Sequence, residues 1–121
     1  MAGETRFVDR KVFFPGQYIF RMGDVGDRAY LVQDGKVQIQ RSKPDGSTVV
    51  LGELTKGGIF GEMALVDDQP RMACAVATEQ TTLVVVGRDQ FQSKLNAADP
   101  FIRALLKIFV RNIRAITDRH M

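Results

Sequence analysis

Short apolar runs alternate with turn-forming residues over most of the chain, from residue 12 to residue 87. Glycine, aspartate and proline interrupt these runs about every ten residues, a spacing typical of an antiparallel sandwich or barrel. All 11 glycines lie before residue 88. The pattern predicts a mainly β domain whose strands cover residues 12–14, 18–20, 29–33, 36–41, 48–54, 73–77 and 82–86.

Two turns between these runs carry clear signals. Asp34-Gly35 separates the third run from the fourth, and Pro44-Asp45-Gly46 separates the fourth from the fifth. Such residues supply the backbone angles that tight hairpins need. We therefore predict that these three consecutive strands form a meander. Within the fourth strand, Val37 and Ile39 share one face, as expected of a strand with one buried side.

The periodicity becomes helical after Gly87. Residues 89–95 suffice for about two turns. A longer helix is predicted to begin at Asp99, an N-cap residue, with Pro100 in the first helical position, and to end near residue 119. Its wide apolar stripe either packs on the domain's own core, or also covers a ligand or meets a partner helix. The stripe consists of Phe101, Ile102, Leu105, Leu106, Phe109, Ile113 and Ile116.

Composition limits the chain to one domain and removes several kinds of chemistry. A length of 121 residues with 45% hydrophobic content suits one core, so we predict a single domain over residues 1–121, with the strands over about 11–87 and the helices over about 88–119. The single cysteine, Cys74, allows no internal disulfide, which is typical of a cytoplasmic protein. The single histidine, His120, cannot supply the ligands of a metal-dependent jelly-roll enzyme. No signal peptide or transmembrane segment is predicted.

Charge is nearly balanced except towards the C-terminal end. Lys and Arg number 17 against 14 Asp and Glu, which gives a net charge of +3. The excess falls mostly in residues 100–121, where five basic residues accompany Asp118 alone. We therefore expect no direct nucleic-acid contact by this chain. The basic residues form a solvated face of the last helix, from which Arg111 or Arg114 could reach a ligand or an acidic partner.

Residues 57–73 contain the side chains best suited to hold a ligand. Gly61 precedes a short turn of helix-forming residues, where a glycine lets backbone N–H groups approach an anion. Arg71 offers a planar guanidinium to two phosphate oxygens. Glu62 beside them would repel a phosphate unless it accepts hydrogen bonds, and ribose hydroxyls are the obvious donors.

The motif Phe60-Gly61-Glu62-Met63-Ala64-Leu65, followed by Arg71, resembles the phosphate-binding cassette of cyclic nucleotide-binding domains. Residues 14–20 and the glycines and aspartates of residues 23–27 resemble the family's first strands and turns, and so do Tyr30 and Gly35. The resemblance covers residues 10–118. It implies an antiparallel β-roll of the jelly-roll-like, double-stranded β-helix kind, mainly β with C-terminal helices. The last of these helices would act as a lid.

The motif changes how its individual residues are interpreted. Taken singly, Arg71 would be a surface ion pair with Asp67 or Asp68, and Glu62 an ordinary acid that offsets a helix dipole. In the family, the cassette Glu hydrogen-bonds the ribose 2′-hydroxyl and the cassette Arg pairs with the cyclic phosphate. The resemblance assigns these roles to Glu62 and Arg71.

Further site residues follow only from the resemblance. Backbone amides of Gly61, Ala64 and Met72 would complete the anion site. The whole ligand-binding set is Gly61, Glu62, Met63, Ala64, Arg71, Met72 and Ala73. The candidate lid residues, which would cover the base, are Phe101, Leu105, Leu106, Phe109 and Arg111.

Two positions depart from the family pattern. Met72 stands where many members carry the Ser or Thr whose hydroxyl is linked with a preference for cGMP, so we predict cAMP as the ligand in preference to cGMP. Cys74 stands where a Thr is frequent, and we interpret it as a small buried apolar residue rather than a reactive thiol.

We therefore predict a sensor module, not an enzyme, that needs no metal or cofactor. Nucleotide binding would move the C-terminal helix and so regulate an attached or partner effector, such as those of cyclic nucleotide-gated channels and kinase regulatory subunits. One alternative is the sensor fragment of a catabolite-activator-type transcription factor that forms a homodimer through residues 100–119. Another is a degenerate domain that has kept Glu62 and Arg71 but no longer binds nucleotide.

Overall fold

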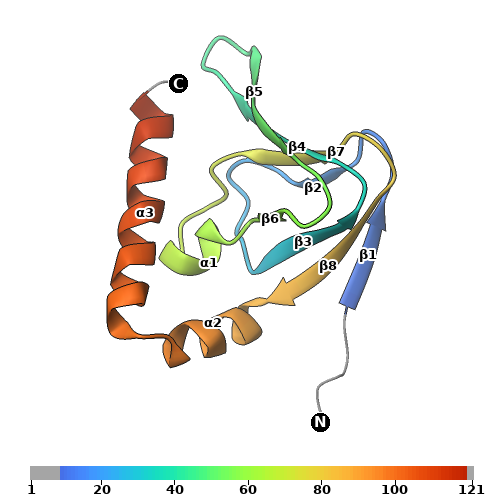
Figure 1. Cartoon of the computed structure of the whole chain (residues 1–121). Coiled ribbons are helices and arrows are strands. Elements are labelled where there is room, and N and C mark those ends of the chain that lie inside the picture. The colour runs from blue at the N-terminus through green and yellow to red at the C-terminus, as the bar shows by residue number, and fades with distance from the viewer. Residues whose placement is uncertain (1–8, 120–121) are drawn as a thin grey trace.

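The computed structural model describes residues 9–119 and contains eight strands followed or interrupted by three helices (Figure 1). His120, the only histidine, lies outside this range. The strands are β1 (Asp9–Phe13), β2 (Tyr18–Phe20), β3 (Arg28–Asp34), β4 (Val37–Ser42), β5 (Thr48–Leu54), β6 (Ile59–Phe60), β7 (Cys74–Ala77) and β8 (Thr81–Gly87). The helices are α1 (Met63–Asp67), α2 (Arg88–Ala97) and α3 (Pro100–Arg119).

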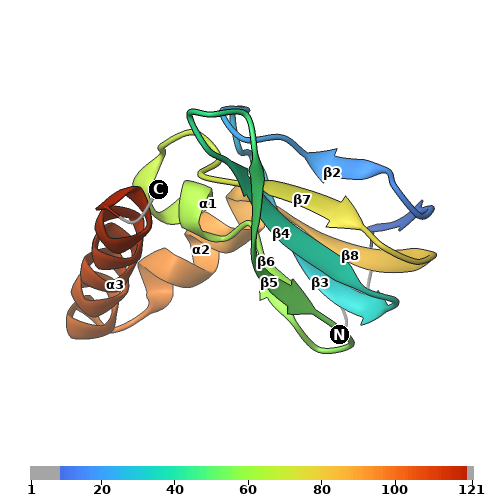
Figure 2. The same cartoon turned by 90° about the horizontal axis from the view of Figure 1, so that it is seen from above.

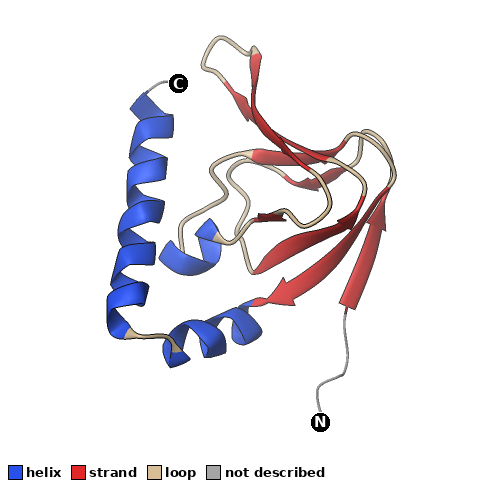
Figure 3. Ribbon diagram, in the orientation of Figure 1, coloured by secondary structure: helices blue, strands red, loops and turns tan. Residues whose placement is uncertain are grey.

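The strands form two antiparallel sheets of four, in the orders β1-β8-β3-β6 and β2-β7-β4-β5. Figure 2 shows the strands together, with α2 and α3 extending from one end of them. The segregation of strands and helices is also clear in Figure 3. This arrangement confirms the predicted antiparallel β-roll with C-terminal helices.

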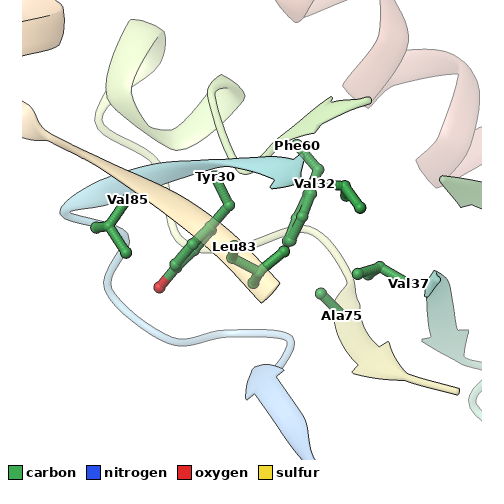
Figure 4. Close-up of a cluster of buried hydrophobic side chains, with 7 residues drawn as sticks. All are labelled: Tyr30, Val32, Val37, Phe60, Ala75, Leu83 and Val85. Carbon is green, nitrogen blue, oxygen red and sulfur yellow. The ribbon is translucent and has the colours of Figure 1, made fainter. Parts of the chain in front are cut away.

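Alternating residues of the two sheets meet in one core (Figure 4). Tyr30 and Val32 of β3 point inward with Leu83 and Val85 of β8, because residues two apart in a strand share a face. From the other sheet come Val37 and Ala75, and Phe60 of β6 completes the cluster. Leu83 and Val37 are fully buried. Val37 therefore lies on the inward face that the sequence predicted for it.

The predicted three-strand meander is wrong in its first half. β3 pairs with β8 and β6, whereas β4 pairs with β5 and β7, so the turn at Asp34-Gly35 carries the chain from one sheet to the other. This corner is anchored on Thr81, which is fully buried. The Lys36 amide donates to Thr81 Oγ1 at 3.1 Å. The second predicted hairpin is confirmed, since β4 and β5 pair around residues 43–47.

The helices begin close to where the sequence placed them. Asp99 Oδ1 accepts a hydrogen bond from the Phe101 amide at 2.8 Å, which confirms its capping role at the start of α3. α3 lies beside α1 and contacts it (Figure 1), and Val110 is buried there. None of the helices within residues 9–119 is long and apolar enough to cross a membrane.

Candidate functional site

A cavity of about 210 Å³ lies where α1 and the segment before β7 meet the β-roll and α3. Its wall combines apolar side chains of four strands with residues of the Gly61–Ala73 segment and one residue of α3. The lining residues are Phe20, Ile39, Leu54, Ile59, Phe60, Gly61, Glu62, Met63, Ala64, Arg71, Met72, Ala73 and Arg114. The cavity is thus mainly apolar, with charged groups limited to one carboxylate and two guanidinium groups.

Arg71 is held in the wall of this cavity with 5% of its surface exposed. Its Nη1 donates to the Gly61 carbonyl and its Nη2 to the Arg28 carbonyl, both at 2.7 Å. The guanidinium carbon lies 4.0 Å from the centre of the Phe20 ring, a cation–π contact. These contacts orient the charged group without neutralising it.

No carboxylate within residues 9–119 forms an ion pair with Arg71, and its Nε atom is buried without a hydrogen-bond partner there. The surface ion pair with Asp67 or Asp68 is therefore ruled out, because those carboxylates pair with Arg114 and Arg88. Burial lowers the pKa of Arg71, opposed by nearby acidic groups, but an arginine in a protein keeps its charge. A buried cation with a free donor is costly unless an anion reaches it.

Glu62 borders the same cavity at the start of α1, and its side chain makes no capping bond to the helix. Its Oε2 atom is buried and has no hydrogen-bond partner among residues 9–119. Burial raises the pKa of Glu62, while a backbone hydrogen bond and the charge of Arg71 act in the opposite direction. Oε2 is thus an acceptor that the described residues leave unsatisfied.

Two glycines make room for this arrangement. Gly61 has a φ of +84°, and a Cβ there would lie 2.9 Å from Arg71 Nη1. At Gly26, a Cβ would lie 2.6 Å from the Ala64 Cβ and 2.8 Å from Arg71 Nε. Any side chain at Gly26 would displace Arg71 or α1, so this glycine, predicted only as a turn residue, also shapes the site.

The structure brings together all seven residues of the predicted ligand-binding set, since each of them lines the cavity. Ala64 and Ala73 are buried, whereas Gly61, Glu62, Met63 and Met72 are half-buried. Cys74, predicted to be buried, is instead half-buried, because it lies at the start of β7, where its Sγ accepts from the Met22 amide at 3.2 Å. The predicted set therefore lies around one cavity.

The five candidate lid residues do not line the cavity. Phe101 is 70% exposed and Phe109 is 53% exposed. Leu105 and Leu106 are half-buried, and Arg111 is exposed. Helix phase accounts for Phe101: α3 buries Val110, and Phe101, nine residues earlier, lies on the opposite side of the helix.

Arg114 is the α3 residue at the cavity, because it lies one turn after Val110 on the same face. The sequence showed Arg114 only as a basic residue that could reach a ligand. The apolar wall formed by Phe20, Ile39 and Leu54 was not predicted as part of a site. For Ile39 alone, the alternation of its strand predicted that the side chain points inward.

This geometry suits a small ligand that has an anionic group, a hydroxyl donor and a flat apolar part. Arg71 Nε and Glu62 Oε2 offer one donor and one acceptor, and the remaining wall is apolar. Over residues 9–119, His, Cys, Asp and Glu form no cluster of three that could hold a metal ion. A β-roll with this cavity fits the class of nucleotide-binding domains.

Comparison with known proteins agrees with that class. The family model for the cyclic nucleotide-binding domain matches residues 10–98, and the chain belongs to this family. It is 33% identical over 108 residues to the cyclic AMP receptor protein of Thermus thermophilus, covering 89% of this chain and 50% of that protein. It is 32% identical over 100 residues to a cAMP-dependent protein kinase regulatory subunit of Dictyostelium discoideum, covering 80% of this chain and 31% of the subunit.

Solved structures show the same likeness. The cAMP-bound form of the EAL enzyme Bd1971 matches with a TM-score of 0.88 and 33% identity, over 93% of this chain and 30% of that one. The Thermus thermophilus catabolite activator protein matches with a TM-score of 0.72 and 30% identity, over 93% of this chain and 52% of that one. The chain thus spans about half, or less, of the length of these relatives.

Proposed function

We propose that this chain is a cytoplasmic cAMP sensor module that binds the nucleotide in the cavity beside Arg71 and Glu62. The observation that carries the proposal is the pair of buried, unsatisfied atoms, Arg71 Nε and Glu62 Oε2, on the wall of one apolar cavity. Phosphate is the anion that suits a pre-oriented guanidinium, and a ribose hydroxyl is a donor that suits a carboxylate. The chain itself makes and breaks no bond in this proposal.

Each part of the nucleotide has a counterpart in the cavity. The cyclic phosphate lies against Arg71 and the backbone amides of Gly61, Ala64 and Met72, and the 2′-hydroxyl donates to Glu62. The apolar wall receives the purine. Names of solved relatives support this assignment, since the Bd1971 structures include cAMP-bound and cGMP-bound forms.

A preference for cAMP over cGMP is part of the proposal. Met72 follows Arg71 and lines the cavity with a thioether side chain, so no side-chain hydroxyl at this position contacts the phosphate or a guanine base. cGMP therefore gains nothing there that cAMP lacks.

The output is a change in the position of α3, which acts on an effector domain or partner protein. The outer face of α3 is suited to that role because its large apolar residues are exposed. They are Phe101, Ile102, Ile108, Phe109, Ile113 and Ile116. The likeness to CRP-like regulators favours a second candidate, in which this face joins two copies of the chain as in a dimeric transcription factor.

Calorimetric titration tests the proposal, on protein that has been unfolded and refolded to remove retained nucleotide. We expect saturable one-to-one binding of cAMP, weaker binding of cGMP, and much weaker binding of 5′-AMP, whose open phosphate does not fit the same cradle. Failure of both cyclic nucleotides to bind to protein shown to be folded would contradict the proposal and leave a degenerate member of the family.

A further inference from the structure

α3 is attached to the rest of the chain mainly by polar contacts. Over residues 100–118, the part of α3 whose side chains the structure describes, Val110 alone is buried. Two ion pairs supplement it, Arg114 with Asp67 and Arg41 of β4 with Asp118 at 2.7 Å. At the start of the helix, Arg103 Nη1 also donates to the Asn96 carbonyl at 2.8 Å and to the Ala98 carbonyl at 3.2 Å. In the second pair Arg41 is 13% exposed and Asp118 is 65% exposed, so solvent screens this pair from the side of the carboxylate. The Arg114–Asp67 pair is the more enclosed contact, with only 16% and 21% of the two side chains exposed.

Arg114 forms hydrogen bonds with both ends of the short loop of residues 67–70. Its Nε donates to Asp67 Oδ2, and its Nη2 donates to Asp67 Oδ1 at 3.1 Å. Its Nη1 donates to the Pro70 carbonyl at 3.1 Å. Asp67 ends α1, and Pro70 immediately precedes Arg71. All three nitrogens of the guanidinium are therefore engaged by residues 67–70.

The backbone of Arg71, which follows this loop, is also held by hydrogen bonds. Its amide donates to the Asp24 carbonyl and its carbonyl accepts from the Gly23 amide, both at 2.8 Å. The loop of residues 67–70 is thus bonded to Arg114 of α3, and the residue that follows it, Arg71, is held by residues 23 and 24. Arg114 also lines the cavity with Arg71, so it contacts both the loop and the space that the ligand would occupy.

We propose that Arg114 and Asp67 form a clamp that couples the position of α3 to occupancy of the cavity. This inference rests on the proposed function and names the contact through which that site is regulated. When the clamp is closed, α3 lies on α1 and Arg114 completes the cavity wall. When it opens, α3 keeps Val110, the half-buried Leu105 and Leu106, the Arg103 hydrogen bonds at its N-terminal end and the Arg41–Asp118 pair, and the cavity loses one wall residue. Nucleotide and docked helix therefore favour each other.

A matched control stands next to Asp67 in the chain. Asp68 also forms an ion pair, but its partner is Arg88 at the start of α2. Asp67→Asn and Asp68→Asn make the same chemical change in adjacent residues, and only the first releases α3. Asp68 has a φ of 57°, a conformation that asparagine adopts readily, so the control is not expected to strain the backbone.

The test combines cAMP titration with amide hydrogen exchange of α3 on the full chain, for the wild type, both single variants and Arg114→Gln. We expect Asp67→Asn to weaken cAMP binding about 5- to 20-fold, because the binding-competent population falls. Its α3 amides exchange faster than those of the wild type with or without nucleotide. Asp68→Asn changes affinity by less than about twofold and leaves α3 exchange unaltered.

Combining Asp67→Asn with Arg114→Gln gives an effect well below the product of the two single effects, because both remove one contact. Circular dichroism of each variant shows that it is folded. Equal α3 exchange and equal affinity in Asp67→Asn and Asp68→Asn would overturn the clamp. If the wild type binds no cyclic nucleotide, the proposed function fails separately. Exchange in the free protein then still decides whether Asp67 holds α3.

Discussion

The β-roll and α3 differ in how far their apolar residues are buried. In the β-roll, inward side chains of both sheets meet in one core, and Leu83 and Val37 are fully buried. In α3, Val110 is buried, while larger residues such as Phe101 and Phe109 face solvent. Burial of apolar surface stabilises the β-roll, whereas most of the apolar surface of α3 contributes nothing to the isolated chain. The proposed function needs this contrast, because a well-packed β-roll would hold the site while a helix with little buried apolar surface would change its contacts.

The same contrast separates the two arginines at the cavity. Arg71 belongs to the frame: backbone carbonyls and the Phe20 ring hold it in place. Arg114 belongs to the helix, and it reaches the frame through a carboxylate and one carbonyl. Arg71 keeps a buried donor, Nε, without a partner among the described residues, whereas all three guanidinium nitrogens of Arg114 donate to residues 67–70. A ligand is therefore expected to depend most strongly on Arg71.

Arg71→Ala should have the largest effect on binding. If Arg71 meets a largely desolvated phosphate, its loss costs about 3–5 kcal/mol, which is roughly a 10²- to 10³-fold or greater rise in the cAMP dissociation constant. Isothermal calorimetry of the wild type and the variant measures this difference. A loss below about 0.5 kcal/mol, which is the size of a surface contact, would show that Arg71 does not hold the phosphate.

Core and helix substitutions should differ sharply in their effect on folding. Leu83→Ala removes a fully buried side chain and should lower the free energy of unfolding by about 2–5 kcal/mol. Phe109→Ala, at an exposed position of α3, should lower it by under about 0.5 kcal/mol. Urea unfolding at dilute, monomeric concentrations measures both. Similar losses in the two variants would mean that α3 is as firmly packed as the frame.

Glu62→Gln should weaken cAMP binding by about 1–3 kcal/mol, the size of a hydrogen bond to a charged group. The 2′-deoxy analogue of cAMP lacks the hydroxyl that Glu62 is proposed to accept from. The wild type should therefore prefer cAMP to the analogue, and the variant should discriminate much less between them. An unchanged preference in Glu62→Gln would assign the hydroxyl to another residue.

The Glu62 carboxylate should also make cAMP affinity depend on pH, which is a smaller effect. Burial raises the pKa of Glu62 in the free chain, and a donating hydroxyl favours the ionised form, so binding lowers that pKa again. Affinity should be full above the raised pKa of the free chain and decline as the pH falls through it, by up to about tenfold per pH unit. cAMP titrations at several pH values measure the decline. A Glu62→Gln variant should bind with a flatter pH profile.

The smallest effect on the domain itself is expected from charge on the outer face of α3. Phe109→Asp should leave cAMP affinity within about twofold, because the residue lies away from the cavity. If two copies meet through residues 100–119, light scattering should detect a dimer for the wild type and a monomer for the variant. A wild-type monomer at high concentration, with and without nucleotide, would leave an effector as the partner of this face.

The cassette could be predicted from the sequence because its chemistry is local. Gly61 and Glu62 adjoin one another, and Arg71 follows within ten residues, so the turn that joins them brings them to one cavity. The corner at Gly35 could not be predicted in the same way. Its residues suit a hairpin, and only the pairing of β3 with β8 places the next strand in the other sheet.

The sequence predicted that α3 would meet the ligand, but which of its residues lie at the cavity could not be predicted, for a related reason. Its apolar stripe is wide, so the sequence does not determine which side of the helix meets the frame. The contact with α1 makes that choice, which buries Val110, places Arg114 at the cavity and leaves the candidate lid residues Phe101 and Phe109 exposed.

A crystal structure of the refolded chain with cAMP tests the central claim most directly. The account predicts one nucleotide in the cavity, with a phosphate oxygen within hydrogen-bond distance of Arg71 Nε and the ribose 2′-hydroxyl donating to Glu62 Oε2. In the same structure, Arg114 should remain on Asp67 and the Pro70 carbonyl. A nucleotide bound elsewhere, or bound in the cavity with Arg71 Nε and Glu62 Oε2 still without partners, would contradict the account.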